Sequence, residues 1–119
     1  MSIKLKTRVE NIVKLLDEKK GEEIEVFNLE DSDYIAKAVI LVNSLGGKHT
    51  GALYDNLRVA FREFGESILG ADESDDWIVI DLGDILIHIM TPQYRMRYSI
   101  EEFLKELKED KFKSDKENI

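Results

Sequence analysis

The sequence has no cysteine, one proline and two histidines among its 119 residues. Without cysteine, the chain can form neither disulfide bonds nor a cysteine-ligated zinc site, which suits a reducing compartment. It also lacks any apolar run near the roughly 20 residues that cross a bilayer, and residues 1–6 are too polar for a signal peptide. These absences predict a soluble, cytoplasmic protein that does not enter a membrane.

Positive charge is also scarce. The chain has 17 Lys and Arg against 25 Asp and Glu, and its formal net charge is -8. Such a protein gains little from the phosphate neutralisation that drives nucleic-acid binding. We therefore expect no direct sequence-specific contact with nucleic acid; near RNA, the protein would dock on a basic protein. A role of the excess acid in solubility alone fits the charge equally well.

The apolar residues that are present recur at regular spacings. Helical spacing between residues 5 and 16 and between residues 53 and 64 predicts two amphipathic helices, each followed by glycine. Apolar and acidic residues alternate within 22–29, as in a strand with one solvated face. Residues 38–42 form a continuous aliphatic run typical of a strand buried on both faces. A further short strand is expected at 67–69.

The most informative segment is 77–90, W-I-V-I-D-L-G-D-I-L-I-H-I-M. Two β-branched runs flank Gly83-Asp84, and glycine in the first position favours a two-residue type II′ hairpin turn. This turn fixes the register, so that Trp77 lies opposite Met90. One face of the hairpin is then purely aliphatic and is expected to be core: Ile78, Ile80, Leu82, Ile85, Ile87 and Ile89. The other face is mixed: Trp77, Val79, Asp81, Leu86, His88 and Met90.

The C-terminal part of the chain predicts two more helices. Thr91-Pro92 looks like an N-cap followed by a first-turn proline, which opens a short helix. Ser99 and Glu102 form a capping box at the start of a last helix. Residues 109–119 alternate charges and are expected to be a disordered or frayed tail. The whole pattern predicts one α/β domain over 1–108, with a single mixed β-sheet flanked by helices.

Candidate catalytic groups are few. Asp81 and Asp84 straddle the hairpin turn, and paired carboxylates can hold magnesium for nucleotidyl transfer. However, turns favour aspartate for conformational reasons, and no Walker motif accompanies the pair. His49 and His88 lie far apart in the sequence, and the glycine-rich loop 46–51 matches no nucleotide-binding fingerprint. We expect no catalytic residue, metal or cofactor; the alternative is a magnesium-dependent nucleotidyltransferase-like enzyme that uses Asp81 and Asp84.

The mixed face of the hairpin has the composition of a protein-docking patch. Trp77 lies opposite Met90, with His88 beside them and acidic residues nearby. Aromatic residues and methionine are enriched at the centres of protein interfaces, which have polar rims. The alternative is that a helix of the same chain covers this face, which would make Trp77 part of the core. The residue pattern alone leaves both possibilities open.

Residues 76–90 closely resemble the central signature of the ribosomal silencing factors, a family also called RsfS, YbeB or Iojap. The resemblance continues into Arg95, Tyr98 and Glu101, which match the family's R-x-x-Y-x-x-E pattern, and it covers roughly residues 5–105. The chain departs from the family pattern at Lys37, Gly46, Gly47, Gln93 and Leu104, where an aspartate, a serine pair, an acid and a tryptophan are usual.

The resemblance implies a nucleotidyltransferase-like topology without known catalysis, and a homodimer when the protein is free. It also implies binding to a large-subunit ribosomal protein at the face that meets the small subunit. The subunits then cannot join, and translation is repressed under starvation or in stationary phase. We expect the mixed hairpin face and the segment after it to form the docking surface. Trp77 and Met90 are expected to be its apolar anchors, Arg95 and Tyr98 its amphipathic flank, and Asp76, Asp81 and Asp84 its acidic rim. Val79 and His88 complete the predicted set.

Overall fold

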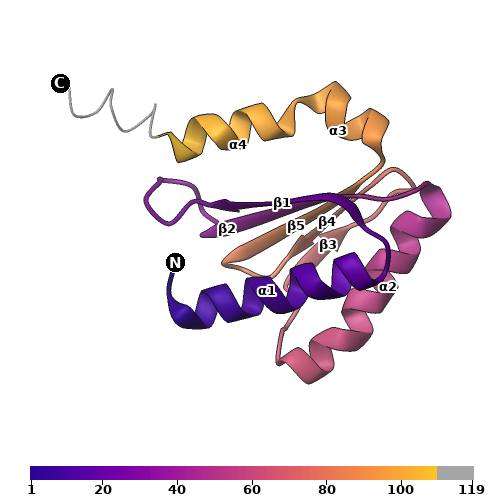
Figure 1. The fold of residues 1–119 in the computed structure, drawn as a ribbon, viewed down its shortest axis with the longest axis horizontal. Coiled ribbons are helices and arrows are strands. Elements are labelled where there is room, and N and C mark those ends of the chain that lie inside the picture. Colours follow the sequence, from indigo (N-terminus) through magenta and orange to yellow (C-terminus); the bar gives the residue numbers. More distant parts are fainter. Residues whose placement is uncertain (110–119) are drawn as a thin grey trace.

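The structure, a computed structural model, describes residues 1–109. Within this range, five strands form one mixed sheet, and helices lie on both of its faces (Figure 1). The helices are α1 (Ile3–Glu18), α2 (Gly47–Phe64), α3 (Pro92–Tyr98) and α4 (Ile100–Lys108). The strands are β1 (Glu22–Asn28), β2 (Ala38–Asn43), β3 (Gly70–Asp72), β4 (Trp77–Asp81) and β5 (Ile85–Met90).

The strand order is β1-β2-β5-β4-β3. β2 and β5 run parallel, and the other neighbouring strands run antiparallel. All six residues of β2 are buried, as its continuous aliphatic run predicts. The predicted α/β class with one mixed sheet is confirmed, while the nucleotidyltransferase-like topology stays a prediction.

α1 and α2 pack together on one side of the sheet, which we call the closed face (Figure 1). The six aliphatic hairpin residues predicted to be core are all buried in this face. Gly21 lies where the chain leaves α1 for β1, and a Cβ there would come within 2.6 Å of Val42 Cγ2 and 2.9 Å of the Leu16 carbonyl oxygen. The close approach of helix and sheet at this point therefore requires glycine.

The predicted hairpin is confirmed in its register. Trp77 pairs with Met90, and the Leu82 N–H donates to the Ile85 carbonyl oxygen at 2.9 Å across the turn. Gly83 has φ 94, whereas the second turn residue does not have positive φ, as a type II′ turn requires.

α3 and α4 lie on the opposite side, which we call the open face because they cover only part of it (Figure 1). α4 packs over β1 and α3 contacts β5. Under α4 lies a second apolar cluster that includes Phe27, Leu41 and Leu104. On β4, in contrast, the residues that face this side are only half-buried.

Three local predictions differ from the structure. The strand expected at 67–69 lies instead at Gly70–Asp72, paired with β4. The capping box at Ser99 is wrong, because Ser99 both ends α3 and begins α4, has φ 50, and makes no side-chain capping hydrogen bond. Thr91 does occupy the N-cap of α3, but its hydroxyl makes no capping bond either.

Residues 110–119 hold most of the predicted tail and lie outside the described residues. The division into a domain at 1–108 and a tail therefore stays a prediction. Within residues 1–109, no helix has both the length and the apolar character needed to span a bilayer.

Candidate protein-docking surface

The uncovered part of the open face lies on β4 and β5. Its half-buried side chains are Trp77, Val79, Asp81 and Leu86, and we call these four residues the open strip. They alternate with the buried aliphatic residues of the same two strands, so the pleat of the sheet directs them away from the core. Apolar groups held partly in solvent on a rigid sheet are the feature expected of a docking surface.

Trp77 belongs to an aromatic cluster at one end of the open strip. Its ring centroid lies 5.3 Å from that of Tyr98 on α3 and 5.9 Å from that of His88 on β5. Tyr98 in turn lies 5.6 Å from Tyr94. The Trp77 indole Nε1 donates a hydrogen bond to His88 Nδ1 at 3.1 Å. The indole is therefore held in one orientation while part of it stays accessible.

His88 supports Trp77 from below and is only 8% exposed. Burial lowers the pKa of His88 to about 4, so the imidazole is neutral at pH 7. An indole N–H can only donate; Nδ1 is therefore the acceptor, and the imidazole proton lies on Nε2. This corrects the predicted place of His88 in the contact surface, because the buried ring can act on a partner only through Trp77.

Met90 is fully buried, which contradicts its predicted role as an exposed anchor. It lies between Trp77 on β4 and Asn43 on β2, at an interior position of the sheet. α3 begins two residues further on, at Pro92. Met90 is therefore part of the interior and offers no surface to a partner.

Arg95 is 6% exposed, so it too is not the accessible flank that was predicted. Its guanidinium donates to the carboxylates of Glu25 at 2.8 Å and Glu101 at 2.5 Å, and to the side-chain oxygen of Asn43 at 2.9 Å. It also donates to the backbone oxygen of Glu23 at 2.6 Å. Arg95 therefore anchors α3 and α4 to β1 and β2.

Helices α3 and α4 also carry exposed apolar side chains. Met96 is 82% exposed and Tyr98 is 49% exposed. The Arg97 guanidinium carbon lies 5.6 Å from the centre of the Tyr98 ring. On α4, the half-exposed Phe103 lies 6.1 Å from Tyr34, between ring centroids. Of the predicted flank residues, Tyr98 is thus accessible.

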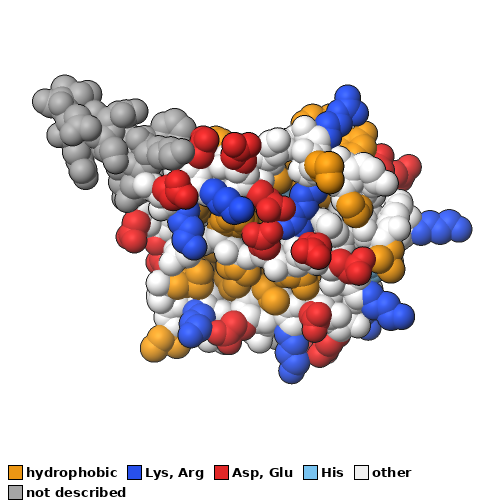
Figure 2. Space-filling model, turned by 45° about the horizontal axis from the view of Figure 1, so that its top comes forward, with side chains coloured by type: hydrophobic (Ala, Val, Ile, Leu, Met, Phe, Trp, Pro, Cys, Tyr) orange, Lys and Arg blue, Asp and Glu red, His pale blue; other side chains and the backbone are white. Residues whose placement is uncertain are grey.

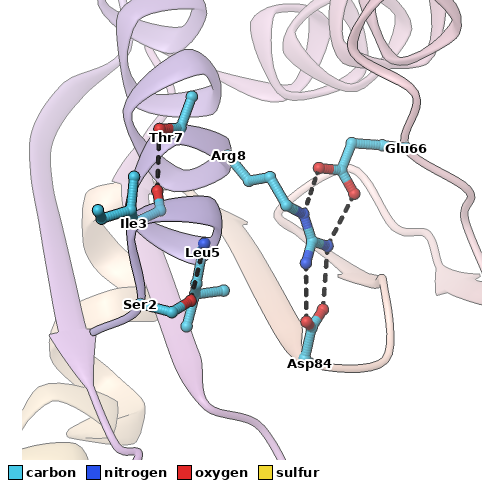
Figure 3. Close-up of polar contacts among 7 residues, drawn as sticks. All are labelled: Ser2, Ile3, Leu5, Thr7, Arg8, Glu66 and Asp84. Carbon is cyan, nitrogen blue, oxygen red and sulfur yellow. Dashed lines mark hydrogen bonds and ion pairs between the residues drawn. The ribbon is translucent and has the colours of Figure 1, made fainter.

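The carboxylates of Asp81 and Asp84 have structural partners. Asp81 Oδ1 accepts a hydrogen bond from the Gly83 N–H at 2.7 Å, which supports the turn. Asp84 accepts from Arg8 of α1 at 2.7 and 3.0 Å, and the same guanidinium binds Glu66 at 2.7 and 2.9 Å (Figure 3). These bonds to Arg8 lower the pKa of Asp84.

Asp84 also lies at the turn, the opposite end of the hairpin from Trp77. This corrects its predicted place in the acidic rim around Trp77. Asp76 does adjoin Trp77: it is half-buried, and its backbone oxygen accepts from the Thr91 N–H at 3.0 Å.

The glycine-rich loop before α2 borders a hollow of about 480 Å³, whose lining includes Gly47, Glu22 and Asp76. A Cβ on Gly47 would lie 3.5 Å from the Asp75 Cβ. Acidic side chains of the chain itself therefore surround this helix start, where an anion would have to bind.

His49 and the surrounding residues show no metal-binding arrangement. The Leu45 N–H donates to His49 Nδ1 at 2.8 Å, and His49 Nε2 lies 2.9 Å from the Lys19 carbonyl oxygen. The imidazole thus ties the end of α1 to the loop before α2. Within residues 1–109, no group of three or more His, Cys, Asp or Glu side chains could hold a metal ion.

Sequence reasoning missed three apolar or aromatic side chains that are at least partly exposed, Tyr34, Met96 and Phe103. Met96 carried a signal, because it stands between two arginines, whereas Phe103 adjoins Leu104 and looks like part of an apolar helix face. Tyr34 carried none. It comes from the loop between β1 and β2, and only the fold brings that loop to α4.

The chain matches the family model described as "Ribosomal silencing factor during starvation" over residues 2–119. It is 32% identical over 98 residues to the ribosomal silencing factor RsfS of Haemophilus influenzae, covering 78% of this chain and 93% of the relative. RsfS of Chromobacterium violaceum is 28% identical over 91 residues, 75% of each chain. The chloroplastic protein Iojap of Zea mays is 26% identical over 94 residues, 78% of this chain and 41% of Iojap.

Solved structures show the same fold. A crystal structure of a protein from Chromobacterium violaceum superposes with a TM-score of 0.80 at 25% identity, covering 88% of each chain. One from Bacillus halodurans superposes with a TM-score of 0.73 at 22% identity, covering 82% of this chain and 93% of the other. The molecule is thus a small mixed-sheet α/β protein of a recurrent type. It belongs to the family of ribosomal silencing factors. This confirms the family resemblance of the sequence.

Proposed function

We propose that this protein represses translation in the cytoplasm by binding a large-subunit ribosomal protein at the subunit interface. The bound protein would block joining of the small subunit under starvation or in stationary phase. The observation that carries the proposal is the accessible open strip with its oriented Trp77, in a chain of a family described as silencing factors during starvation. Occupying a surface requires no covalent chemistry, so the mechanism needs no catalytic residue.

The contact is built from an apolar centre and an acidic edge. Trp77, Val79 and Leu86 form the centre, Tyr98 extends it onto α3, and Asp76 adds negative charge at the end near Trp77. Ribosomal proteins are basic, and this chain carries a net charge of -8. Complementary charge mainly accelerates association and orients the partners, while the desolvated aromatic centre supplies most of the affinity.

Buried polar groups preorganise this surface. His88 fixes the indole of Trp77, and Arg95 fixes the helix that carries Tyr98. A surface already in its binding conformation loses less side-chain entropy on association. His88 and Arg95 therefore contribute to binding by positioning other residues.

The free protein is proposed to be a homodimer. A second copy that covers the open strip would remove its apolar side chains from water in a two-fold symmetric contact. Because the same residues would then serve both interfaces, dimerisation would compete with ribosome binding.

Co-sedimentation with purified large subunits tests the docking surface. We expect Trp77→Ala to weaken binding by roughly 2 kcal/mol or more, since a centrally placed tryptophan is typically a hot spot. The matched control is Val59→Ala, an apolar residue that is 72% exposed on α2; it should bind like the unmodified protein.

Adding small subunits tests the mechanism. The unmodified protein should lower the fraction of joined ribosomes in a sucrose gradient, and Trp77→Ala should not. If Trp77→Ala is folded by circular dichroism and still binds fully, the docking face is wrong. If the unmodified protein binds large subunits but joining proceeds normally, the steric mechanism is wrong.

A further inference from the structure

The outer edge of β1 is a second surface with binding potential, at the end of the sheet away from β4. Within the described residues, no strand pairs with this edge. The Leu29 N–H donates to the Lys37 carbonyl oxygen at 2.8 Å. Because inward and outward peptide groups alternate in an antiparallel ladder, those of Val26 and Asn28 point to the open edge. An edge of this kind can accept a further strand.

One side of this edge is an apolar groove between α1 and β1, with a volume of about 580 Å³. Its apolar lining consists of Val9, Val13, Ile24 and Val26. Val26 is 37% exposed, so the groove is accessible from solvent. Figure 2 shows an apolar band along the middle of this side of the molecule, with acidic side chains gathered next to it.

The other side of the edge is an acidic hollow of about 590 Å³ beneath α3 and α4. Its charged lining consists of Glu23, Glu25, Glu101, Glu102, Arg95 and Lys105. Arg95 is already bound by Glu25 and Glu101, so the hollow keeps a surplus of negative charge. Burial and the neighbouring Glu101 carboxyl raise the pKa of Glu25, although Glu25 also contacts Arg95.

The two sides together specify the chemistry of a partner. Successive side chains of a strand point to opposite faces, so a strand added to β1 would place alternate side chains over the groove and over the hollow. We propose that the β1 edge binds an extended segment of another protein in which aliphatic residues alternate with Lys or Arg. This edge is separate from the open strip, and the inference does not depend on the proposed ribosomal function.

A second copy of the chain fits the edge poorly. In an antiparallel pair of two β1 strands, Glu25 of one copy would lie on the acidic side of the other, and like charges across strands are unfavourable. The register also shifts between Glu22 and Glu25, and Glu23 has φ 49. Such an irregularity shortens the edge that two identical strands could share.

Synthetic peptides of about seven residues, an ordinary strand length, test the inference on the full-length, isotope-labelled protein. A peptide of alternating Val and Lys should shift the backbone amide NMR signals of Val26 and Asn28 most strongly. It should bind at least about tenfold more tightly than a peptide with the same residues in two blocks. Replacing Lys by Glu, or methylating alternate peptide nitrogens, should abolish binding.

Variants of the protein separate the contribution of the β1 backbone from that of the acidic hollow. Val26→Pro removes an outward N–H without removing a bond to β2, and should abolish binding of the alternating peptide. Glu102→Lys in the hollow should weaken binding at least about tenfold, whereas Glu63→Lys on the exposed side of α2 should leave it unchanged.

Three results would overturn the inference. The first is equal affinity for the alternating and block peptides, and the second is amide shifts centred on the open strip. The third is a dimer in light scattering that Val26→Pro dissociates, which would assign the edge to a second copy. If Val26→Pro does not fold, the methylated peptide decides the question with the unmodified protein.

Discussion

The two faces of the sheet have different roles, although the same strands form both. On the closed face, β4 and β5 bury six aliphatic side chains under α1 and α2. On the open face, the same strands keep Trp77, Val79 and Leu86 partly in solvent, and polar contacts from His88 hold the indole in place. The comparison teaches that strand alternation assigns each side chain of β4 and β5 to a face, and that the helices then decide which open-face side chains stay accessible. Substitutions on the closed face should therefore affect folding, and those at the accessible residues of the open strip should affect binding.

The largest expected difference is between Ile87→Ala on the closed face and Val79→Ala on the open face. Ile87 is fully buried, so its truncation leaves a cavity and should lower the free energy of unfolding by about 3 kcal/mol. Val79 is half-buried, and its truncation should cost less than about 1 kcal/mol. Urea unfolding followed by circular dichroism measures both. Similar losses for the two variants would break the distinction between the faces.

Acid should destabilise the protein through His88, whose imidazole is buried on the open face. The pKa of His88 is about 4 in the folded protein against 6.5 in the unfolded chain. Between these values the unfolded chain binds a proton that the folded protein does not, so stability falls as pH falls from 6.5 to 4. The loss should reach about 3 kcal/mol. His88→Gln should flatten this part of the curve of unfolding free energy against pH, and parallel curves would contradict the assignment.

Glycine substitutions test how tightly the closed face is packed. Gly21→Ala would force a methyl group into Val42 and the Leu16 backbone, and should cost about 2 kcal/mol. Gly51→Ala is the matched control, because a Cβ there meets no atom within 4 Å. Inside α2, it should instead stabilise by about 0.5 kcal/mol or more. Thermal unfolding shows whether each substitution raises or lowers the stability. A Gly21→Ala variant of unchanged stability would show that the structure around Gly21 rearranges at no cost.

The smallest effect is expected at the ion pair that joins α1 to the hairpin turn (Figure 3). Arg8 lowers the pKa of Asp84. The ion pair therefore stabilises the folded protein fully above the unfolded pKa of 3.8, and this stabilisation is lost as pH falls through the lower folded pKa. The Asp84 side chain is 34% exposed, and solvent screening should limit the cost of Asp84→Asn at pH 7 to below about 1 kcal/mol. Asp55→Asn in the exposed pair with Arg58 is the control and should cost almost nothing.

The closed face could be predicted from the sequence because residues close together in the chain determine which of its side chains are buried. The two-residue turn at Gly83 fixes the register of the hairpin, and strand alternation then assigns every side chain between residues 77 and 90 to a face. The buried strand at 38–42 is equally local, since a continuous aliphatic run predicts it without knowledge of its neighbours.

The open face could be predicted only in part, because contacts between distant segments decide which of its residues are accessible. Arg95 is buried by bonds to Glu23, Glu25 and Asn43, which lie 52 to 72 residues away in the sequence. Asp84 is engaged by Arg8, 76 residues away. Residue types at a docking patch and in a buried clamp are similar, and only the placement of the helices separates them.

The position of the aromatic cluster has a practical consequence for measurement. Trp77 is the only tryptophan of the chain, so all indole fluorescence originates at the open strip. Its emission depends on water near a ring that rests on His88 and Tyr98. A partner bound to this face would shift the emission wavelength of Trp77, whereas a peptide bound at the β1 edge would leave that wavelength unchanged. The protein thus carries its own label for telling its two surfaces apart in solution.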